Sequence, residues 1–156
     1  MKSKFLSRLF FLTAMALMFS LTSYGQAHPS HNGEKAFDGN DIISYFNGEI
    51  KKGSEKYTYE YQKVKLYFAS DETREIFKKD PEKYFPAYNG WCAIALAGGS
   101  LAKPDYSNYK IQDGKLLFFE VRAFFNGRTA WEKDPEINKI TADAKYDELF
   151  KKKEEN

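Results

Sequence analysis

Residues 109–119 read Tyr-Lys-Ile-Gln-Asp-Gly-Lys-Leu-Leu-Phe-Phe, and Asp113-Gly114 at their centre decides how they fold. A two-residue hairpin turn of type I′ needs positive φ at both positions, which favours Asp-Gly. This turn would set Ile111 opposite Leu116, with a further apolar pair beyond them. The stretch therefore predicts an antiparallel β-hairpin.

A second hairpin is predicted earlier in the chain. Tyr57, Tyr59 and Tyr61 alternate with polar residues, which is the period of a strand with one aromatic face. Residues 64–68 form another apolar strand, and Gln62-Lys63 would be the turn between the two. The two hairpins predict a small antiparallel sheet.

Helix-start signals follow each hairpin. Ser70 precedes two acidic residues, as an N-cap does. Asp80-Pro81-Glu82 and Asp134-Pro135-Glu136 each place an Asp at the cap and a Pro in the first turn. We interpret this recurrence as repeated local chemistry and not as a duplication, because the flanking residues do not match. Helices are also predicted over 123–131 and 136–150, so the expected fold class is α+β, with a sheet of hairpins packed against short helices.

Charge and cysteine content exclude several classes of protein. The 156 residues carry 24 Lys and Arg against 22 Asp and Glu, a net charge of +2. Residues 1–25 contribute three of the cations and no acid, so the remainder carries a net charge of −1. This balance argues against nucleic acid as a partner. The single cysteine, Cys92, excludes an internal disulfide and a cysteine-rich zinc module.

The amino-terminal residues predict export. Basic residues at positions 2, 4 and 8 precede an apolar run over 9–21, and small residues follow at Ser23 and Gly25. This order is typical of a secretory signal peptide, here residues 1–25, cleaved after Gly25. The apolar run is shorter than the ~20 residues that a membrane span needs. We therefore expect a periplasmic or extracellular protein without a membrane span after processing.

The processed chain is expected to have three parts. Residues 26–35 are polar and predict a flexible arm, 36–150 predict one domain, and 151–156 predict a frayed tail. The arm contains both histidines of the chain, His28 and His31. Because they lie outside the domain that contains the cysteine, a Cys-His-Asn enzyme is not indicated. We expect a protein without catalytic activity.

Cys92 and the arm are the candidate metal ligands. Cys92 lies in an apolar segment between Gly90 and Gly98-Gly99, where it is either a small buried hydrophobe or a soft-metal ligand. If cleavage follows Gly25, the new terminus would be Gln26-Ala27-His28. Its α-amine, two amides and imidazole would form a square-planar nitrogen set suited to Cu(II) or Ni(II). Cyclisation of Gln26 would remove this site.

Several motifs taken together resemble the YHS domain family, in its exported stand-alone form. They occur in order over about residues 36–148, at 41–46, 57–70, 77–84, 88–93, 110–116 and 131–135. The resemblance implies a small α+β domain and, in the heavy-metal branch of the family, soft metals bound by cysteines. This chain departs from that branch, because Ser44 and Ala69 stand where cysteines would be expected. Only Cys92 remains.

Two functional hypotheses follow from the sequence. The first is an exported binding domain that handles copper or a similar soft metal through Cys92, His28 and His31. The alternative is a small-molecule or partner-binding module with an aromatic-lined pocket and no metal. Its candidate ligand-binding residues are Trp91, Tyr45, Asp41 and Tyr88.

Overall fold

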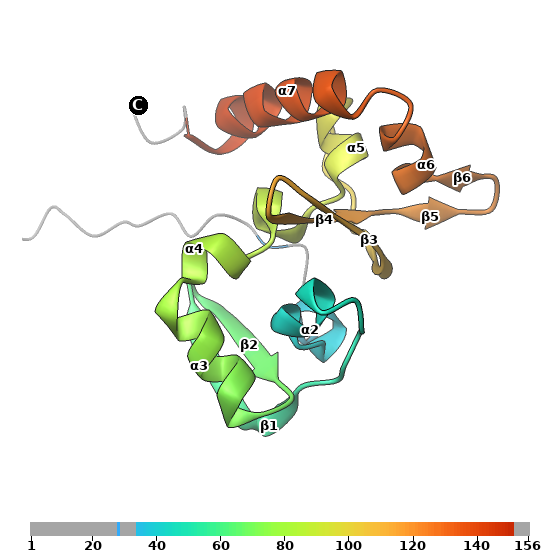
Figure 1. Cartoon of the computed structure of the whole chain (residues 1–156). Helices are drawn as coiled ribbons and strands as arrows, with labels where there is room; N and C mark the ends of the chain where they lie inside the picture. The colour runs from blue at the N-terminus through green and yellow to red at the C-terminus, as the bar shows by residue number, and fades with distance from the viewer. Residues whose placement is uncertain (1–27, 29–33, 152–156) are drawn as a thin grey trace, which may run out of the picture.

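The computed structural model describes residue 28 and residues 34–151. The predicted signal peptide, the arm apart from residues 28, 34 and 35, and tail residues 152–156 lie outside this description. The first half of the chain contains η1 (Ala36–Gly39), α2 (Ile42–Phe46), β1 (Ser54–Tyr61), β2 (Val64–Phe68), α3 (Asp71–Lys79) and α4 (Pro81–Tyr84). The second half contains η2 (Ala87–Gly90), α5 (Ala93–Ala97), β3 (Asp105–Gln112), β4 (Lys115–Phe119), β5 (Val121–Arg122), β6 (Phe125–Asn126), α6 (Gly127–Trp131), α7 (Pro135–Tyr146) and a π-helical turn, η3 (Asp147–Lys151). In Figure 1 the first half occupies the lower part of the view and the second half the upper part.

The strands form three antiparallel two-stranded sheets, β1–β2, β3–β4 and β5–β6, packed with short helices. The predicted α+β class is therefore confirmed. The hairpin predicted around Asp113-Gly114 is also confirmed, because both residues have positive φ and Ile111 pairs with Leu116. The predicted turn at Gln62-Lys63 has the same geometry.

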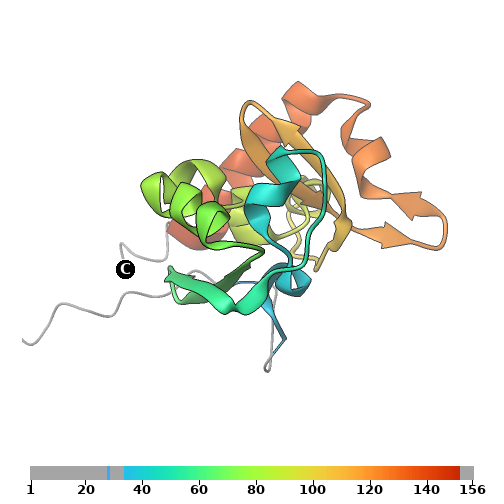
Figure 2. The same ribbon diagram turned by 60° about the horizontal axis from the view of Figure 1, so that its bottom comes forward.

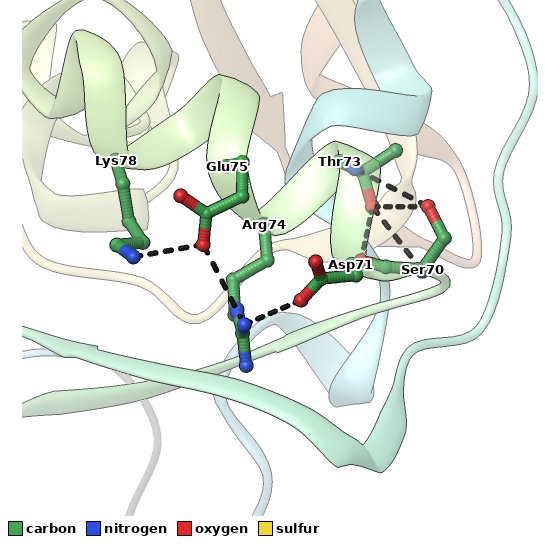
Figure 3. A network of polar contacts seen from close by, with 6 residues as sticks. All are labelled: Ser70, Asp71, Thr73, Arg74, Glu75 and Lys78. Atoms are coloured by element: carbon green, nitrogen blue, oxygen red, sulfur yellow. Dashed lines mark hydrogen bonds and ion pairs between the residues drawn. The ribbon is translucent and has the colours of Figure 1, made fainter.

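The helix starts follow the predicted capping chemistry. The Ser70 hydroxyl accepts a hydrogen bond from the Thr73 amide at 3.2 Å, and the Thr73 hydroxyl accepts one from the Ser70 amide, which closes a capping box (Figure 3). Asp80 and Asp134 cap α4 and α7, each with a proline at the next position.

One predicted helix is wrong in part. Residues 123–131 were expected to be helical, but α6 begins only at Gly127, and residues 121–126 form the β5–β6 hairpin. Asn126 caps α6 by accepting hydrogen bonds from the Arg128 and Thr129 amides, so the chain stays extended until this cap is reached.

The two halves repeat the same backbone at a spacing of 51 residues. Every described residue with positive φ has a counterpart at this distance, with a similar φ: the pairs are 37/88, 38/89, 39/90, 48/99, 62/113 and 63/114. Short helices α2 and α5 occupy matching positions, and so do both hairpins. The bulge between Ser54 and Thr58 recurs between Asp105 and Tyr109.

Backbone hydrogen bonds repeat at the same spacing. The Asp41 amide donates to the Lys51 carbonyl at 2.8 Å, and the Cys92 amide donates to the Ala102 carbonyl at 3.0 Å. Further matching bonds connect residues 40 to 37 and 91 to 88, 48 to 45 and 99 to 96, and 49 to 44 and 100 to 95. We call residues 36–84 the first repeat and residues 87–146 the second repeat.

This symmetry corrects our interpretation of Asp80-Pro81 and Asp134-Pro135 as local chemistry alone. Each of these motifs follows an aromatic residue at the end of the preceding helix, Phe77 or Trp131, that packs on its own hairpin. The residues that flank the two Asp-Pro motifs did not reveal the duplication, because most side chains differ between the repeats while the backbone conformation and hydrogen bonds are shared.

Strand β4 lies between the two hydrophobic cores. Leu116 and Phe118 belong to the core built mainly from the first repeat, whereas Leu117 and Phe119 belong to the core of the second repeat. Side chains of a strand alternate between its faces, so a continuous apolar run serves both cores.

Candidate functional site

Cys92 is buried and already bonded to the protein. Its exposed fraction is 0%, and its Sγ accepts a hydrogen bond from the Glu120 amide at 3.3 Å. Burial raises the pKa of the thiol, which favours the neutral form and opposes formation of the thiolate that binds soft metals.

The repeat explains why a hydrogen-bond acceptor stands at this position. Asp41, 51 residues earlier, is equally buried, and its Oδ2 accepts a hydrogen bond from the Ala69 amide at 2.9 Å. Ala69 and Glu120 are also 51 residues apart. Cys92 and Asp41 therefore have the same structural role. Each side chain accepts a hydrogen bond that connects the start of a short helix to the residue that follows its hairpin. Asp41 in addition caps α2 through the Ile43 amide at 2.9 Å.

His28 lies close to the segment that contains the cysteine. Its ring packs edge-on against Phe37 with 4.7 Å between ring centroids. A Cβ added to Gly90 would lie 3.4 Å from His28 Nε2 and only 2.5 Å from Phe37, so glycine is needed for this close approach. His31 and the predicted Gln26-Ala27 terminus lie outside the described residues.

Within residue 28 and residues 34–151, no group of three or more His, Cys, Asp or Glu side chains is placed to hold a metal ion. The structure brings His28 to the Gly90 segment, but Cys92 stays enclosed.

Tyr45, Trp91 and Asp41, three of the four predicted ligand contacts, are packed into the protein. The Tyr45 hydroxyl donates to the Tyr106 carbonyl at 2.9 Å and accepts from the Asn40 amide group at 2.8 Å. Burial raises the pKa of this phenol above its ordinary value of 10.0. Trp91 is 8% exposed and belongs to the core of the second repeat.

Tyr88, the fourth predicted ligand contact, is also only 8% exposed, but it lines a groove of about 620 Å³, which Trp91 does not. Both repeats and η3 contribute side chains to it. Four aromatic rings line this groove, together with three carboxylates, two amides, one ammonium group and two small apolar residues: Tyr61, Phe85, Tyr88, Tyr146, Glu82, Asp143, Asp147, Gln62, Asn89, Lys115, Pro86 and Ala87. We call it the inter-repeat groove.

The aromatic rings of the groove are held in pairs. Tyr61 packs against Phe85 with centroids 5.2 Å apart, and Tyr88 packs against Tyr146 at 5.8 Å. Such edge-on and tilted pairs fix the ring orientations. Phe85 and Tyr88 are 6% and 8% exposed, so they present only their edges to the groove.

Hydrogen bonds and ion pairs hold the polar side of the groove. The Tyr88 hydroxyl donates to Asp143 Oδ1 at 2.9 Å, and Lys139 Nζ lies 2.7 Å from Asp143 Oδ2. Burial, followed by the neighbouring Asp143 carboxylate, raises the pKa of Tyr88. Burial also raises the pKa of Tyr146 to about 12. Both phenols are therefore neutral hydrogen-bonding groups at ordinary pH.

Sequence reasoning found Tyr88 but missed its partners. Tyr61, Phe85 and Tyr146 come from a hairpin end, a loop and the last long helix, and only the folded arrangement brings them together. The high content of aromatic residues, 17% of the chain, indicated an aromatic-lined pocket, but it did not identify which residues line it.

Comparisons with known proteins gave no match to a family model, a curated protein or a solved structure. The described residues contain no helix of the length and hydropathy that crossing a membrane requires.

Proposed function

We propose that this chain is an exported, non-catalytic binding module that takes a small organic ligand or a partner segment in the inter-repeat groove. The observation that carries the proposal is the groove itself, in which paired aromatic rings lie beside carboxylates, amides and one ammonium group. Concave sites of a few hundred Å³ that combine apolar walls with a few polar groups are the usual form of ligand sites.

Binding is favoured over catalysis by the chemistry of the lining. Its residues include no histidine, cysteine or serine. Among the three carboxylates of the lining, that of Asp143 is engaged by Lys139 and by the Tyr88 hydroxyl. The lining residues therefore offer no pair of a nucleophile and an adjacent base.

A matched pair of substitutions tests the groove. Ala87→Trp would fill it, while Ala144→Trp places the same side chain at an exposed position of α7 that does not line it. Aromatic amino acids, monosaccharides and short aromatic peptides would serve as probes in ligand-observed NMR. We expect at least one class to bind wild type and Ala144→Trp but not Ala87→Trp. Equal binding to all three chains, or no binding by any class, would contradict the proposal.

Export is tested separately, by mass spectrometry of the protein secreted from a bacterial host. We expect a chain that begins at Gln26, either free or cyclised. A secreted or retained chain that still carries residues 1–25 would contradict this part of the proposal.

Copper handling is a second candidate, favoured by the position of His28 against Gly90, two residues from Cys92. In this second hypothesis the metal ligands are His28, His31 and the processed amino terminus of the arm. Cys92 would become a fourth ligand only if its hydrogen bond to the Glu120 amide breaks. Cu(II) titration of processed wild type, His28→Ala and Cys92→Ser tests it. We expect loss of affinity in His28→Ala, and equal affinity in all three chains would remove both proposed ligands. Membership of the YHS family stays a prediction.

A further inference from the structure

The β5–β6 hairpin is the place where the second repeat departs from the first. The spacing between equivalent residues is 51 up to Ala69 and Glu120, but 54 from Phe77 and Trp131 onward. The first repeat passes from β2 to α3 through residues 69 and 70, whereas residues 120–126 connect β4 to α6 in the second repeat, with a net gain of three residues in the spacing. The hairpin is therefore an addition to the repeated unit, and the symmetry of the fold does not require it.

The tip of this hairpin is apolar and exposed. Phe124 is 104% exposed, and Val121 and Phe125 are 48% and 40% exposed. Arg122 pairs with Phe125, so Ala123 and Phe124 form the two-residue turn. Two-residue hairpin turns favour Asn, Asp and Gly, so no local conformational need explains a phenylalanine here. We call residues 121–126 the hairpin tip.

The hairpin tip projects from the body of the molecule. Figures 1 and 2 both show β5 and β6 extending away from the helices and from the other two sheets. A convex projection cannot enclose a small molecule. The side chain of Phe124 can be buried only when the hairpin tip binds another molecule or a membrane.

Cationic side chains accompany the apolar tip. The shallow hollow of about 470 Å³ between the tip and α6 is lined by Arg122 and Lys133 and by no carboxylate. Arg122 is 67% exposed and forms an ion pair with Glu120 at 2.5 Å, and Arg128 at the start of α6 lies 3.9 Å from Glu132. Lys133 is therefore the cationic side chain of this region that forms no ion pair among the described residues. An anionic surface would complement this charge.

We propose that the hairpin tip inserts into the interface of an anionic lipid surface, with Phe124 entering the acyl boundary and Arg122 and Lys133, which line the hollow beside it, at the head groups. Interfacial binding strengthens with buried apolar area and with attraction to anionic lipids, and this projection offers both. A fluid interface accepts an isolated projecting ring without a preformed pocket. The proposal is independent of the inter-repeat groove.

Vesicle sedimentation with the full chain tests this proposal. The lipids would be phosphatidylcholine alone and phosphatidylcholine mixed with phosphatidylglycerol, at low and high salt. The variants would be Phe124→Ser, Lys133→Glu and, as a control, Ile50→Ser, which removes an apolar side chain 42% exposed in the loop before β1. All chains carry the same amino-terminal segment, so differences between them report on the substituted positions.

We expect wild type and Ile50→Ser to bind the mixed vesicles equally. Phe124→Ser should weaken partitioning at least about tenfold, since one phenylalanine would no longer be buried. Lys133→Glu should weaken it severalfold, and high salt should reduce this second effect. Equal binding by wild type and Phe124→Ser would overturn the proposal. So would an absence of vesicle binding, or self-association in analytical ultracentrifugation that Phe124→Ser abolishes, since the tip would then dock onto protein.

Discussion

The two repeats share one backbone conformation, but the side chains on the outer faces of their hairpins pack differently. In the first, Phe68 packs on Phe77 with ring centroids 5.5 Å apart, and in the second Phe119 packs on Trp131 at 5.7 Å. These inner faces correspond closely, but the outer faces do not.

The outer face of β2 carries Tyr67, with the ammonium groups of Lys35 and Lys65 near its ring. The equivalent residue in β4 is Phe118, which is buried against Phe37 and Tyr45 of the first repeat. The comparison shows that the first repeat covers Phe118 of the second hairpin, while Tyr67 of its own hairpin is 8% exposed and has two lysine side chains over its ring. A tyrosine with lysines and a fully apolar phenylalanine are what these two environments favour.

High pH should have the largest effect, because both repeats bury phenols whose ionised forms are disfavoured. Burial raises the pKa of Tyr45 in the first repeat and of Tyr88 and Tyr146 in the second. Below about pH 9 these groups are protonated in the folded and unfolded chains, so their stabilising effect is complete. As pH rises above about 10, the unfolded chain releases protons that the folded chain keeps, and the free energy of unfolding falls.

This prediction is checked by urea unfolding across alkaline pH. Tyr45→Phe and Tyr88→Phe should each flatten the decline, and a larger change for one of them would show which phenol contributes more to it. A free energy of unfolding that stays constant to about pH 12 would contradict the burial of these phenols.

Asp41→Ala should be the most destabilising of the single substitutions at neutral pH. It removes the acceptor for the partly buried Ala69 amide and the cap of α2 together. Each unsatisfied buried amide costs about 1–3 kcal/mol and a lost cap about 1 kcal/mol, so we expect a loss of about 3 kcal/mol. Denaturant unfolding measures it, with Asp41→Asn as the control that keeps one side-chain acceptor. A loss below about 1 kcal/mol would break the assignment of both roles.

Cys92→Ala is the matching change in the second repeat and should cost about half as much. Cys92 Sγ accepts a hydrogen bond from the Glu120 amide at 3.3 Å and does not cap α5 through its side chain. We expect a loss of about 1.5 kcal/mol from one weak bond and a small cavity. Native thiol labelling gives a second readout, because an enclosed thiol should react only after unfolding. Rapid labelling of the folded chain would instead support Cys92 as an accessible ligand.

The smallest effect concerns the helices that follow the hairpins. Ser70→Ala breaks the capping box of α3 and should cost about 1 kcal/mol, whereas Lys78→Ala removes only an exposed ion pair with Glu75 and should cost under about 0.5 kcal/mol (Figure 3). Thermal melting of the two variants compares them. A Lys78→Ala loss equal to that of Ser70→Ala would show that the charged network, and not the cap, holds this helix.

Turns and helix caps could be predicted from the sequence, but contacts between residues far apart in the chain could not. Asp113-Gly114, Ser70 and the two Asp-Pro motifs act through neighbouring backbone atoms, so the residue types alone predicted the turn and the caps. The β5–β6 hairpin was missed because its apolar residues also fit a helix, and tertiary context decided between them.

The candidate site was predicted only through Tyr88. The equivalence of Asp41 and Cys92 depends on amides 28 residues further along the chain, which no spacing rule for short motifs reveals. A comparison of the chain with itself at a shift of 51 would have supplied the missing signal, since Ala36-Phe37-Asp38-Gly39 and Ala87-Tyr88-Asn89-Gly90 then align.

The placement of β4 makes the duplicated halves inseparable. Because alternate residues of one strand complete two different cores, neither half can lose its structure without exposing apolar surface of the other. The protein should consequently melt in a single cooperative transition, and either half expressed alone should fail to fold.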